Sequence, residues 1–240
     1  GKYACSAGPI VGFNAKYEKM ELHNVYEYDI NSAYSSIMLE AVPDINNPKI
    51  NVKLKHNQVG FLIDEDLTMI DKPGLEVDVA FDLVQLSKQG KEFILRLYNE
   101  KETAETKEER AAAKLKLNAA IGYYQRYNPF LRAYIVHSCN KRIKAILDDD
   151  SVLWNTDAIF SLKQRPELAV GASIGEFEEV KIDRFAYIGN NYQINYDLPK
   201  YRGIAKAWYK EGFDILKDSL PQRNNVYKFD LAQMKIIKEK

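Results

Sequence analysis

The chain has 240 residues, of which 46% are hydrophobic and 28% charged, a composition that excludes the disordered, collagen-like and disulfide-rich classes. Its 34 basic and 34 acidic residues cancel, so net charge cannot attract an anionic partner, and a local cationic stripe or a bound metal would have to do so. Cys5 and Cys139 form no C-x-x-C pair, so we expect two reduced thiols and no zinc site. Without a membrane span or a secretory signal, we expect a cytoplasmic protein.

The first part of the chain is predicted to hold a strand, a short helix and a small sheet. Polar and apolar residues alternate from Val25 to Ile30, which indicates a strand, and residues 33–40 can turn helical directly after it. Prolines and short β-prone pieces follow, and we expect those pieces to pair as a small antiparallel sheet. The pieces are residues 50–54, 60–63 and 75–81.

The middle of the chain is predicted to be mainly helical. Residues 83–98 and 105–122 indicate an antiparallel helical hairpin, with Thr103 as the N-cap of its second helix. Residues 130–147 indicate a further long helix, followed by an apolar strand at 151–160. The remaining predictions are strands at 175–181 and 186–188, a β-turn at 189–191, a basic segment at 200–206 and a final helix at 229–240.

Two aspartates lie beside strand-forming residues. Asp29 belongs to the end of the strand at 25–30, where a carboxylate can either start a turn or face a cleft. Asp157 lies with Asn155 in the segment 151–160, flanked on both sides by apolar residues, and burying these polar groups is costly unless they meet a ligand or each other. A tight hairpin turn at Asn155 and Asp157 explains the same residues equally well, so both interpretations stay open.

The helix predicted at 105–122 carries a cationic stripe. Spacings of three and four residues place its basic side chains on one face, which ends in Asn118 and Gly122. Beside two carboxylates such a stripe suits a triphosphate with magnesium, because cations neutralise phosphate oxygens and a glycine lets a base approach the backbone. A solvated face, paired with acidic neighbours such as Glu105, is the alternative. The basic residues are Lys107, Arg110 and Lys114.

In their order along the chain and in their residues, these segments resemble the motifs of family B DNA polymerases. YDINSAYSSIM at 28–38 resembles motif A, KLKLNAAIG at 114–122 resembles motif B, and WNTDAIF at 154–160 resembles motif C. The leader SAGPIVGFN at 6–14 and the stretch at 187–193 stand where the protein-primed bacteriophage branch has its Gly-rich linker and its K-x-Y motif. The chain is therefore most similar to that branch.

The resemblance implies an α+β fold, a polymerase right hand with an antiparallel palm sheet, a helical-hairpin fingers subdomain and a small thumb. The implied subdomains are palm at 1–82, fingers at 83–122, palm again at 123–185 and thumb at 186–240. The implied function is that of a DNA-directed DNA polymerase, a nucleotidyltransferase of DNA replication that adds deoxynucleotides to a primer 3′ end. Primer–template DNA and dNTP are the implied partners, with a terminal protein and a separate exonuclease or other replication subunit as further ones, in a bacterial host cell.

Individual residues also receive roles from the resemblance. Asp29 and Asp157 match the catalytic aspartates, which with the Ile30 carbonyl hold two Mg²⁺ ions, for which Mn²⁺ can substitute. Tyr34 matches the steric-gate tyrosine that excludes ribonucleotides, which disfavours RNA synthesis. The residues implied to bind the nucleotide are Ile30, Tyr34, Lys101, Arg110, Lys114 and Asn118, and those implied to bind DNA are Gly122, Tyr192, Lys200 and Arg202.

Four positions depart from the family pattern. Asn155 replaces the first aspartate of motif C, which removes a negative charge near the metals. Ser35, Ile121 and Asn190 replace the proline of motif A, the tyrosine of motif B and the lysine of K-x-Y. These departures leave open a second function, that of a catalytically weakened, polymerase-like subunit that binds nucleic acid in a phage replication complex.

Segment lengths give two further expectations. Because the sequence starts at the leader, we expect no 3′–5′ exonuclease domain in this chain. Only 34 residues, at positions 123–156, separate Gly122 from Asp157, too few for the insertion that forms a tunnel around the template in this branch. We therefore expect modest strand displacement and low processivity.

Overall fold

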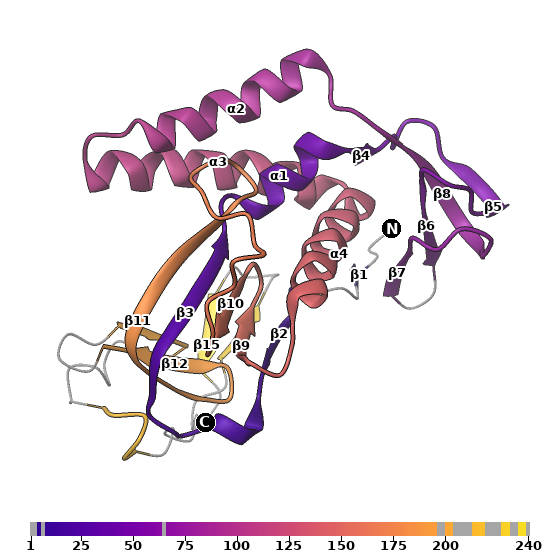
Figure 1. Cartoon of the computed structure of the whole chain (residues 1–240). Coiled ribbons are helices and arrows are strands. Elements are labelled where there is room, and N and C mark those ends of the chain that lie inside the picture. Colours follow the sequence, from indigo (N-terminus) through magenta and orange to yellow (C-terminus); the bar gives the residue numbers. More distant parts are fainter. Residues whose placement is uncertain are drawn as a thin grey trace.

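Helices lie between and above two β-sheets in this computed structural model, which describes residues 4–5, 8–63, 66–195, 200–203, 213–218, 227–230 and 235–238. The helices are α1 (Ala33–Glu40), α2 (Lys88–Glu102), α3 (Lys107–Tyr127) and α4 (Pro129–Ile146), with a short 3₁₀ turn at Ala15–Tyr17. Figure 1 shows α2 and α3 running side by side across the top of the molecule, and α4 between the two sheets. None of the helices in the described residues combines the length and apolar character needed to cross a bilayer.

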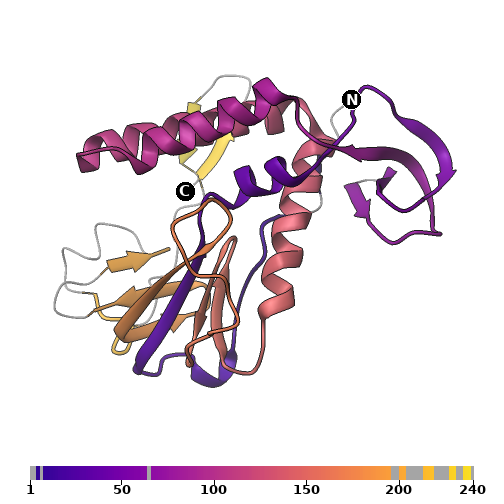
Figure 2. The ribbon, with the colours of Figure 1, turned by 45° about the horizontal axis from the view of Figure 1, so that its top comes forward.

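The larger sheet is antiparallel throughout and has β3 (Leu22–Ile30) near its middle, between β11 (Phe177–Ile188) and β10 (Ala158–Ser161). Its strand order is β13-β12-β11-β3-β10-β9-β2, where β2 is Val11–Phe13, β9 is Ser151–Asn155, β12 is Asn191–Ile194 and β13 is Lys200–Arg202. Figure 2 shows its strands running toward the helices, so the ends of β3 and β11 lie beneath α2 and α3.

Alternation along β3 explains why this strand is covered on both faces. Tyr28 and Ile30 belong to the core that contains residues of α1 to α4, whereas Val25 belongs to a second core of aromatic side chains from β10, β11 and β12. Successive strand residues point to opposite faces, so Asp29 lies on the same face as Val25. The predicted strand at 25–30 and helix at 33–40 are both confirmed.

The second sheet lies beyond α4, apart from the first (Figure 1). Its order is β1-β7-β6-β8-β4 with β5 also on β8, and it is antiparallel except for the pairing of β1 with β7. The small sheet predicted after the first helix is therefore confirmed, although the prediction missed β7. The strands are β1 (Ala4–Cys5), β4 (Val42–Pro43), β5 (Lys49–Lys53), β6 (Gln58–Ile63), β7 (Asp66–Ile70) and β8 (Glu76–Val84).

The predicted helical hairpin is confirmed in α2 and α3, but its caps differ from the prediction. Ser87 begins α2, accepting a hydrogen bond from the Gly90 amide at 3.1 Å, so this helix starts later than residue 83. Thr103 is not the N-cap of α3: its hydroxyl and amide both donate to the Asn99 carbonyl and end α2. Thr106 has that role, in a reciprocal capping box with Glu109.

Three other predictions about elements need correction. Residues 151–160 form not one strand but the hairpin of β9 and β10, because Thr156 takes a left-handed conformation with φ 62°. Residues 177–188 form one continuous strand, β11. The predicted final helix is wrong where the chain is described, because β14 (Tyr227–Asp230) pairs with β15 (Lys235–Lys238).

The predicted subdomain boundaries fall inside elements of the structure. The boundary after residue 82 lies in β8, the one after 122 in α3 and the one after 185 in β11. The last boundary also divides one sheet, because β11 continues through the turn at Gly189 into β12 and β13. The segment assigned to a thumb therefore begins as part of the same sheet that carries Asp29.

Candidate active site

The structure brings Asp29 and Asp157 together at one end of the larger sheet. Asp29 is the penultimate residue of β3, and Asp157 lies in the turn between β9 and β10. Ala158 pairs with Asp29 across the two strands, and the Ile30 amide donates to the Asp157 carbonyl at 3.0 Å. Two carboxylates that are far apart in the sequence thus become neighbours through strand register.

The turn that carries Asp157 is held from two sides. The Thr156 amide donates to the Ile10 carbonyl at 2.7 Å, and the Ile10 amide donates to Asn140 Oδ1 of α4 at 2.7 Å. The buried Cys139 thiol, also on α4, lies 3.5 Å from the Thr156 carbonyl. The leader segment and α4 therefore fix the tight turn, which is the hairpin that the sequence left as one of two interpretations.

Both aspartates line a cavity of about 970 Å³ between the sheet end, α1 and the hairpin of α2 and α3. The five stripe residues of α3 line the same cavity, so the predicted stripe faces the carboxylates. Tyr34, in the first turn of α1, lines it as well. The stripe residues are Lys107, Arg110, Lys114, Asn118 and Gly122.

Burial and like charge act together on the two carboxyl groups. Desolvation, with the Asp157 charge as a further contribution, raises the pKa of Asp29 to about 7. Burial also raises the pKa of Asp157, against the opposing charges of Arg202 and Lys114. Asp29 Oδ1 is buried without a hydrogen-bond partner, so this carboxylate lacks the compensation that a buried charge normally requires.

The cations of the cavity differ in how far they are already paired. Lys101 is only 7% exposed, with Nζ 2.8 Å from Glu102 Oε1 and 3.5 Å from Ser32 Oγ. Arg110 lies 3.6 Å from the other oxygen of Glu102. Lys107 and Lys114 make no ion pair with another described side chain and are exposed. These two lysines therefore offer positive charge to a ligand most directly.

The remaining residues implied to bind the nucleotide surround the carboxylates. Burial raises the pKa of the Tyr34 hydroxyl to about 12, so it stays protonated. Ile30 is 2% exposed and is also among the residues that line the cavity. A Cβ built on Gly122 would meet no atom within 4 Å, so open space lies above this glycine. Asn118 is exposed on the same helix face.

Three of the residues implied to bind DNA, Tyr192, Lys200 and Arg202, lie on β12 and β13 of the larger sheet. Tyr192 is 7% exposed, and its ring packs on Phe160 and Phe185 with centroids 4.9 and 5.6 Å away, which leaves its hydroxyl to make polar contacts. Arg202 belongs to β13 of the same sheet and reaches Asn155 Oδ1 at 3.3 Å. Lys200 begins β13, and its side chain lies outside the described part of the chain. In the strand order β13 and β9 are five positions apart. Arg202 of β13 can therefore reach Asn155 of β9 only because the sheet curls.

Sequence reasoning missed one carboxylate of the site, Glu178. It pairs directly with Asp29 across β11 and β3, lines the cavity and contributes to the raised pKa of Asp29. The alternation of residues 177–181 was visible in the sequence, but the register that places Glu178 opposite Asp29 was not.

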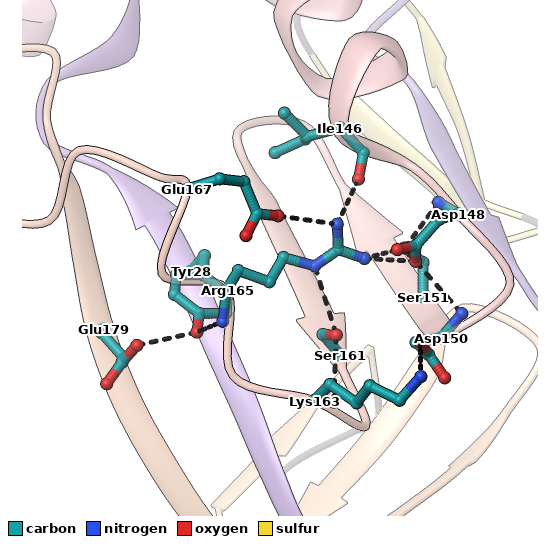
Figure 3. A network of polar contacts seen from close by, with 10 residues as sticks. All are labelled: Tyr28, Ile146, Asp148, Asp150, Ser151, Ser161, Lys163, Arg165, Glu167 and Glu179. Carbon is teal, nitrogen blue, oxygen red and sulfur yellow. Dashed lines mark hydrogen bonds and ion pairs between the residues drawn. The ribbon is translucent and has the colours of Figure 1, made fainter.

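On the opposite face of the same strands, a polar network surrounds Arg165 (Figure 3). The guanidinium, 7% exposed, donates to the Ile146 carbonyl at 2.8 Å and to Ser151 at 3.0 Å, and also pairs with Asp148. The Arg165 amide donates to the Tyr28 hydroxyl at 2.7 Å, which in turn donates to Glu179. Burial alone would raise the pKa of Asp148, but hydrogen bonds from Ser151 and Arg165 lower it.

The fold is similar to solved structures of the DNA polymerase of phi29. A ternary complex of that enzyme with primer–template DNA and incoming nucleotide aligns with a TM-score of 0.64 and 14% identity, over 85% of this chain and 55% of that one. An orthorhombic crystal form aligns with a TM-score of 0.62 and 13% identity, over 87% of this chain and 56% of that one. A complex with single-stranded DNA aligns with a TM-score of 0.60 and 13% identity, over 78% of this chain and 48% of that one. No model of a protein family and no curated protein matches the sequence.

At this level of identity the likeness shows a polymerase-like α+β fold. The chain spans about half the length of the structures that it matches. What supports a function is therefore the arrangement of this chain's own residues around the cavity.

Proposed function

We propose that this chain is the core of a DNA polymerase that transfers nucleotides from dNTP to a primer 3′ end on a DNA template. One observation carries the proposal: Asp29 and Asp157, brought together by strand register, line the same cavity as the cationic face of α3. Two of the similar structures, one described as a complex with primer–template DNA and incoming nucleotides and one with primer–template DNA, support the same substrates for this chain.

The carboxylate pair is suited to magnesium. Asp29 Oδ1 is buried without a donor, and the neighbouring Asp157 charge makes a cation at this place favourable. Within the described residues no group of three or more histidine, cysteine or acidic side chains could hold a metal by itself. Mg²⁺ is commonly bound by one or two carboxylates together with substrate phosphates, so a pair of aspartates is sufficient. Asp29, Asp157 and the Ile30 carbonyl would hold it, and Mn²⁺ would substitute.

Bound there, two ions would supply Lewis-acid neutralisation of the attacking and leaving oxygens. The chain's own residues do the remaining work. Lys107 and Lys114 neutralise the triphosphate, and Asn118 and Gly122 leave a polar, open surface for the base. Tyr34, which lines the same cavity, would contact the sugar with its ring. In this proposal α2 and α3 act as fingers and the larger sheet acts as palm, with a terminal protein or a separate exonuclease as further partners.

Primer extension tests the proposal. Purified wild-type protein should extend a labelled primer with dNTP and Mg²⁺ and stop when a chelator is added. Asp29→Asn and Asp157→Asn should each lower the rate by at least about a thousandfold, because each removes a metal ligand. Asp183→Asn is the matched control, since Asp183 is exposed on β11. Wild-type rates in either active-site variant would disprove the proposal.

The second function, a weakened subunit that only binds nucleic acid, rests on Asn155 in motif C. It predicts that the wild-type chain binds primer–template DNA equally well with and without a chelator and extends the primer with neither Mg²⁺ nor Mn²⁺. That result would replace the proposal with the binding function.

A further inference from the structure

Tyr98 connects the helical hairpin of α2 and α3 to the loop at residues 162–176, which joins β10 to β11. Its side chain is buried, with the residue only 6% exposed, and its hydroxyl donates a hydrogen bond to the Ala172 carbonyl of that loop. Burial, with the charge of Glu102 as a further contribution, raises the pKa of this hydroxyl, so it stays protonated and can donate. A side chain of α2 is thus bonded to a loop of the larger sheet.

The same loop holds the turn that follows Asp29. The Asn31 side-chain amide donates to the Gly171 carbonyl at 2.9 Å, and the Asn31 backbone amide donates to the Glu176 carbonyl at 2.8 Å. Asn31 lies only two positions after Asp29 in the chain. The loop therefore connects Tyr98 of α2 to the strand end that carries the Asp29 carboxylate.

The aromatic ring of Tyr98 also contacts a cation of the cavity. Lys101 lies one turn later on α2, with Nζ 4.7 Å from the centroid of the Tyr98 ring. The same Nζ lies 3.5 Å from Ser32 Oγ and 2.8 Å from Glu102 Oε1. A cation over the face of a tyrosine is attracted to the ring, most strongly where water is excluded, and Lys101 is buried. The ring thus helps to hold the ammonium in the lining of the cavity.

These contacts form a closed circle between α2 and the turn after β3. Each neighbouring pair in the circle is joined by a hydrogen bond, by the chain itself or by the contact of cation and ring, and its members in order are Tyr98, Ala172, Gly171, Asn31, Ser32 and Lys101. Because every member is held by two others, the circle fixes where the Lys101 ammonium lies relative to the end of β3.

A second pair of the same kind on α2 offers a comparison. Arg96 lies with Cζ 5.5 Å from the centroid of the Phe93 ring, but Phe93 is 38% exposed and neither residue lines the cavity of the aspartates. Of these two pairs, only the buried one places its cation in that lining. The contact of Tyr98 with Lys101 is therefore distinguished by its position and not by its type.

We propose that Tyr98 is a positioning residue for the incoming nucleotide: its ring holds the Lys101 ammonium toward the cavity, and its hydroxyl ties α2 to the loop that holds Asn31. This inference rests on the proposed function. In it Tyr98 touches no substrate and acts through Lys101. The triphosphate then meets an ammonium that is already in place, so binding does not have to order a long flexible side chain.

Binding of dNTP without catalysis tests this role. Each protein is loaded with a primer–template that ends in a dideoxynucleotide, and the matching dNTP is titrated with Mg²⁺ while the fluorescence of a 2-aminopurine in the template is followed. Lys101→Gln should bind dNTP about tenfold more weakly than wild type. Tyr98→Met, which fills the space without a ring, should lose nearly as much, and Tyr98→Phe, which keeps the ring, only about threefold. Phe93→Met is the matched control and should bind dNTP like wild type.

The deciding comparison is between single and double variants. Because the ring acts through Lys101, adding Tyr98→Met to Lys101→Gln should weaken binding by about threefold, as Tyr98→Phe does alone, and not by a further tenfold. Each dissociation constant comes from the midpoint of a titration, so a partly unfolded variant does not distort it. A further tenfold loss in the double variant, or wild-type affinity in Tyr98→Met, would overturn the inference.

Primer extension separates this inference from the proposed function. If Asp29→Asn abolishes extension while Tyr98→Met binds dNTP like wild type, only this inference fails. If Asp29→Asn extends primers at the wild-type rate, the proposed function fails, whatever the Tyr98 variants show.

Discussion

The Arg165 network and the cavity at Asp29 use neighbouring residues of the same strands in opposite ways. Tyr28 pairs with Glu179, and Asp29 pairs with Glu178, so the two sites lie on opposite faces of β3 and β11. In the network, acids, hydroxyls and a carbonyl surround one buried cation (Figure 3). In the cavity, Asp29 faces acidic neighbours and keeps an oxygen without a partner.

The Arg165 network stabilises the fold, whereas the cavity at Asp29 has the character of a functional site. A buried charge whose donors and acceptors are all paired ties loop 162–176 to α4 and β9, and so stabilises the fold. At Asp29 a buried carboxylate oxygen lacks that compensation, and a bound cation would supply it. Perturbed carboxyl groups in a cavity are the usual mark of a functional site.

The largest effect on stability is expected at Arg165. Arg165→Met leaves Asp148 and the Ile146 carbonyl without their buried partner, so the free energy of unfolding should fall by about 3–5 kcal/mol. Primer extension per folded molecule should stay near the wild-type rate. Urea unfolding measures the free energy of unfolding, and primer extension at low temperature measures the activity. Arg96→Met, on the exposed side of α2, is the control. If the free energy of unfolding of Arg165→Met fell by less than about 1 kcal/mol, the Arg165 network would not stabilise the fold as this comparison requires.

Asp29→Asn should raise the free energy of unfolding in metal-free buffer, whereas Arg165→Met lowers it. The pKa of this carboxyl is raised from 3.8 to about 7, so above pH 7 the folded protein holds an unfavourable charge, and this cost disappears as the pH falls toward 4. The variant should therefore be more stable than wild type by about 1–3 kcal/mol at pH 8 and by less at pH 5. Thermal unfolding at both pH values is the measurement. A variant less stable than wild type at pH 8 would show that Asp29 is compensated.

A smaller loss is expected where the network meets β3. Tyr28→Phe removes the acceptor of the Arg165 amide and the donor to Glu179, which should cost about 1–2 kcal/mol. The same change also removes a hydroxyl whose pKa burial raises to about 12. Spectrophotometric titration of tyrosine should lose one late-titrating group. An unchanged stability would mean that water replaces the hydroxyl.

The smallest effect is expected at Lys114, on the cavity side. Lys114→Gln removes a cation that lowers the pKa of both aspartates and should raise the KM for dNTP about tenfold, or about 1.4 kcal/mol. Lys116→Gln is the matched control, because Lys116 pairs with Glu100 away from the cavity. Equal KM values in the two variants would mean that α3 does not contact the triphosphate.

Local signals in the sequence predicted much of the fold. The alternation at 25–30 and the helical pattern at 33–40 were confirmed, because each depends on residues close in the chain. The hairpin turn at Thr156 was only one of two open interpretations, and the strands β14 and β15 were not predicted, since a left-handed residue and strand pairing depend on partners elsewhere.

The site was predictable only as far as motif order allowed. Asp29, Asp157 and the stripe of α3 do line one cavity, as the motifs implied. Glu178 was missed because strand register decides its position, and so was the contact of Arg202 with Asn155, which joins distant strands of the sheet; a short segment of sequence shows neither.

Binding of Mn²⁺, followed by electron paramagnetic resonance, tests most directly whether the two aspartates share divalent cations. The wild-type chain is loaded with a primer–template that ends in a dideoxynucleotide and with the matching dNTP. We predict that it binds Mn²⁺ at least tenfold more tightly than Asp29→Asn or Asp157→Asn, and no more tightly than Asp183→Asn. Equal affinity in all four proteins would contradict the account.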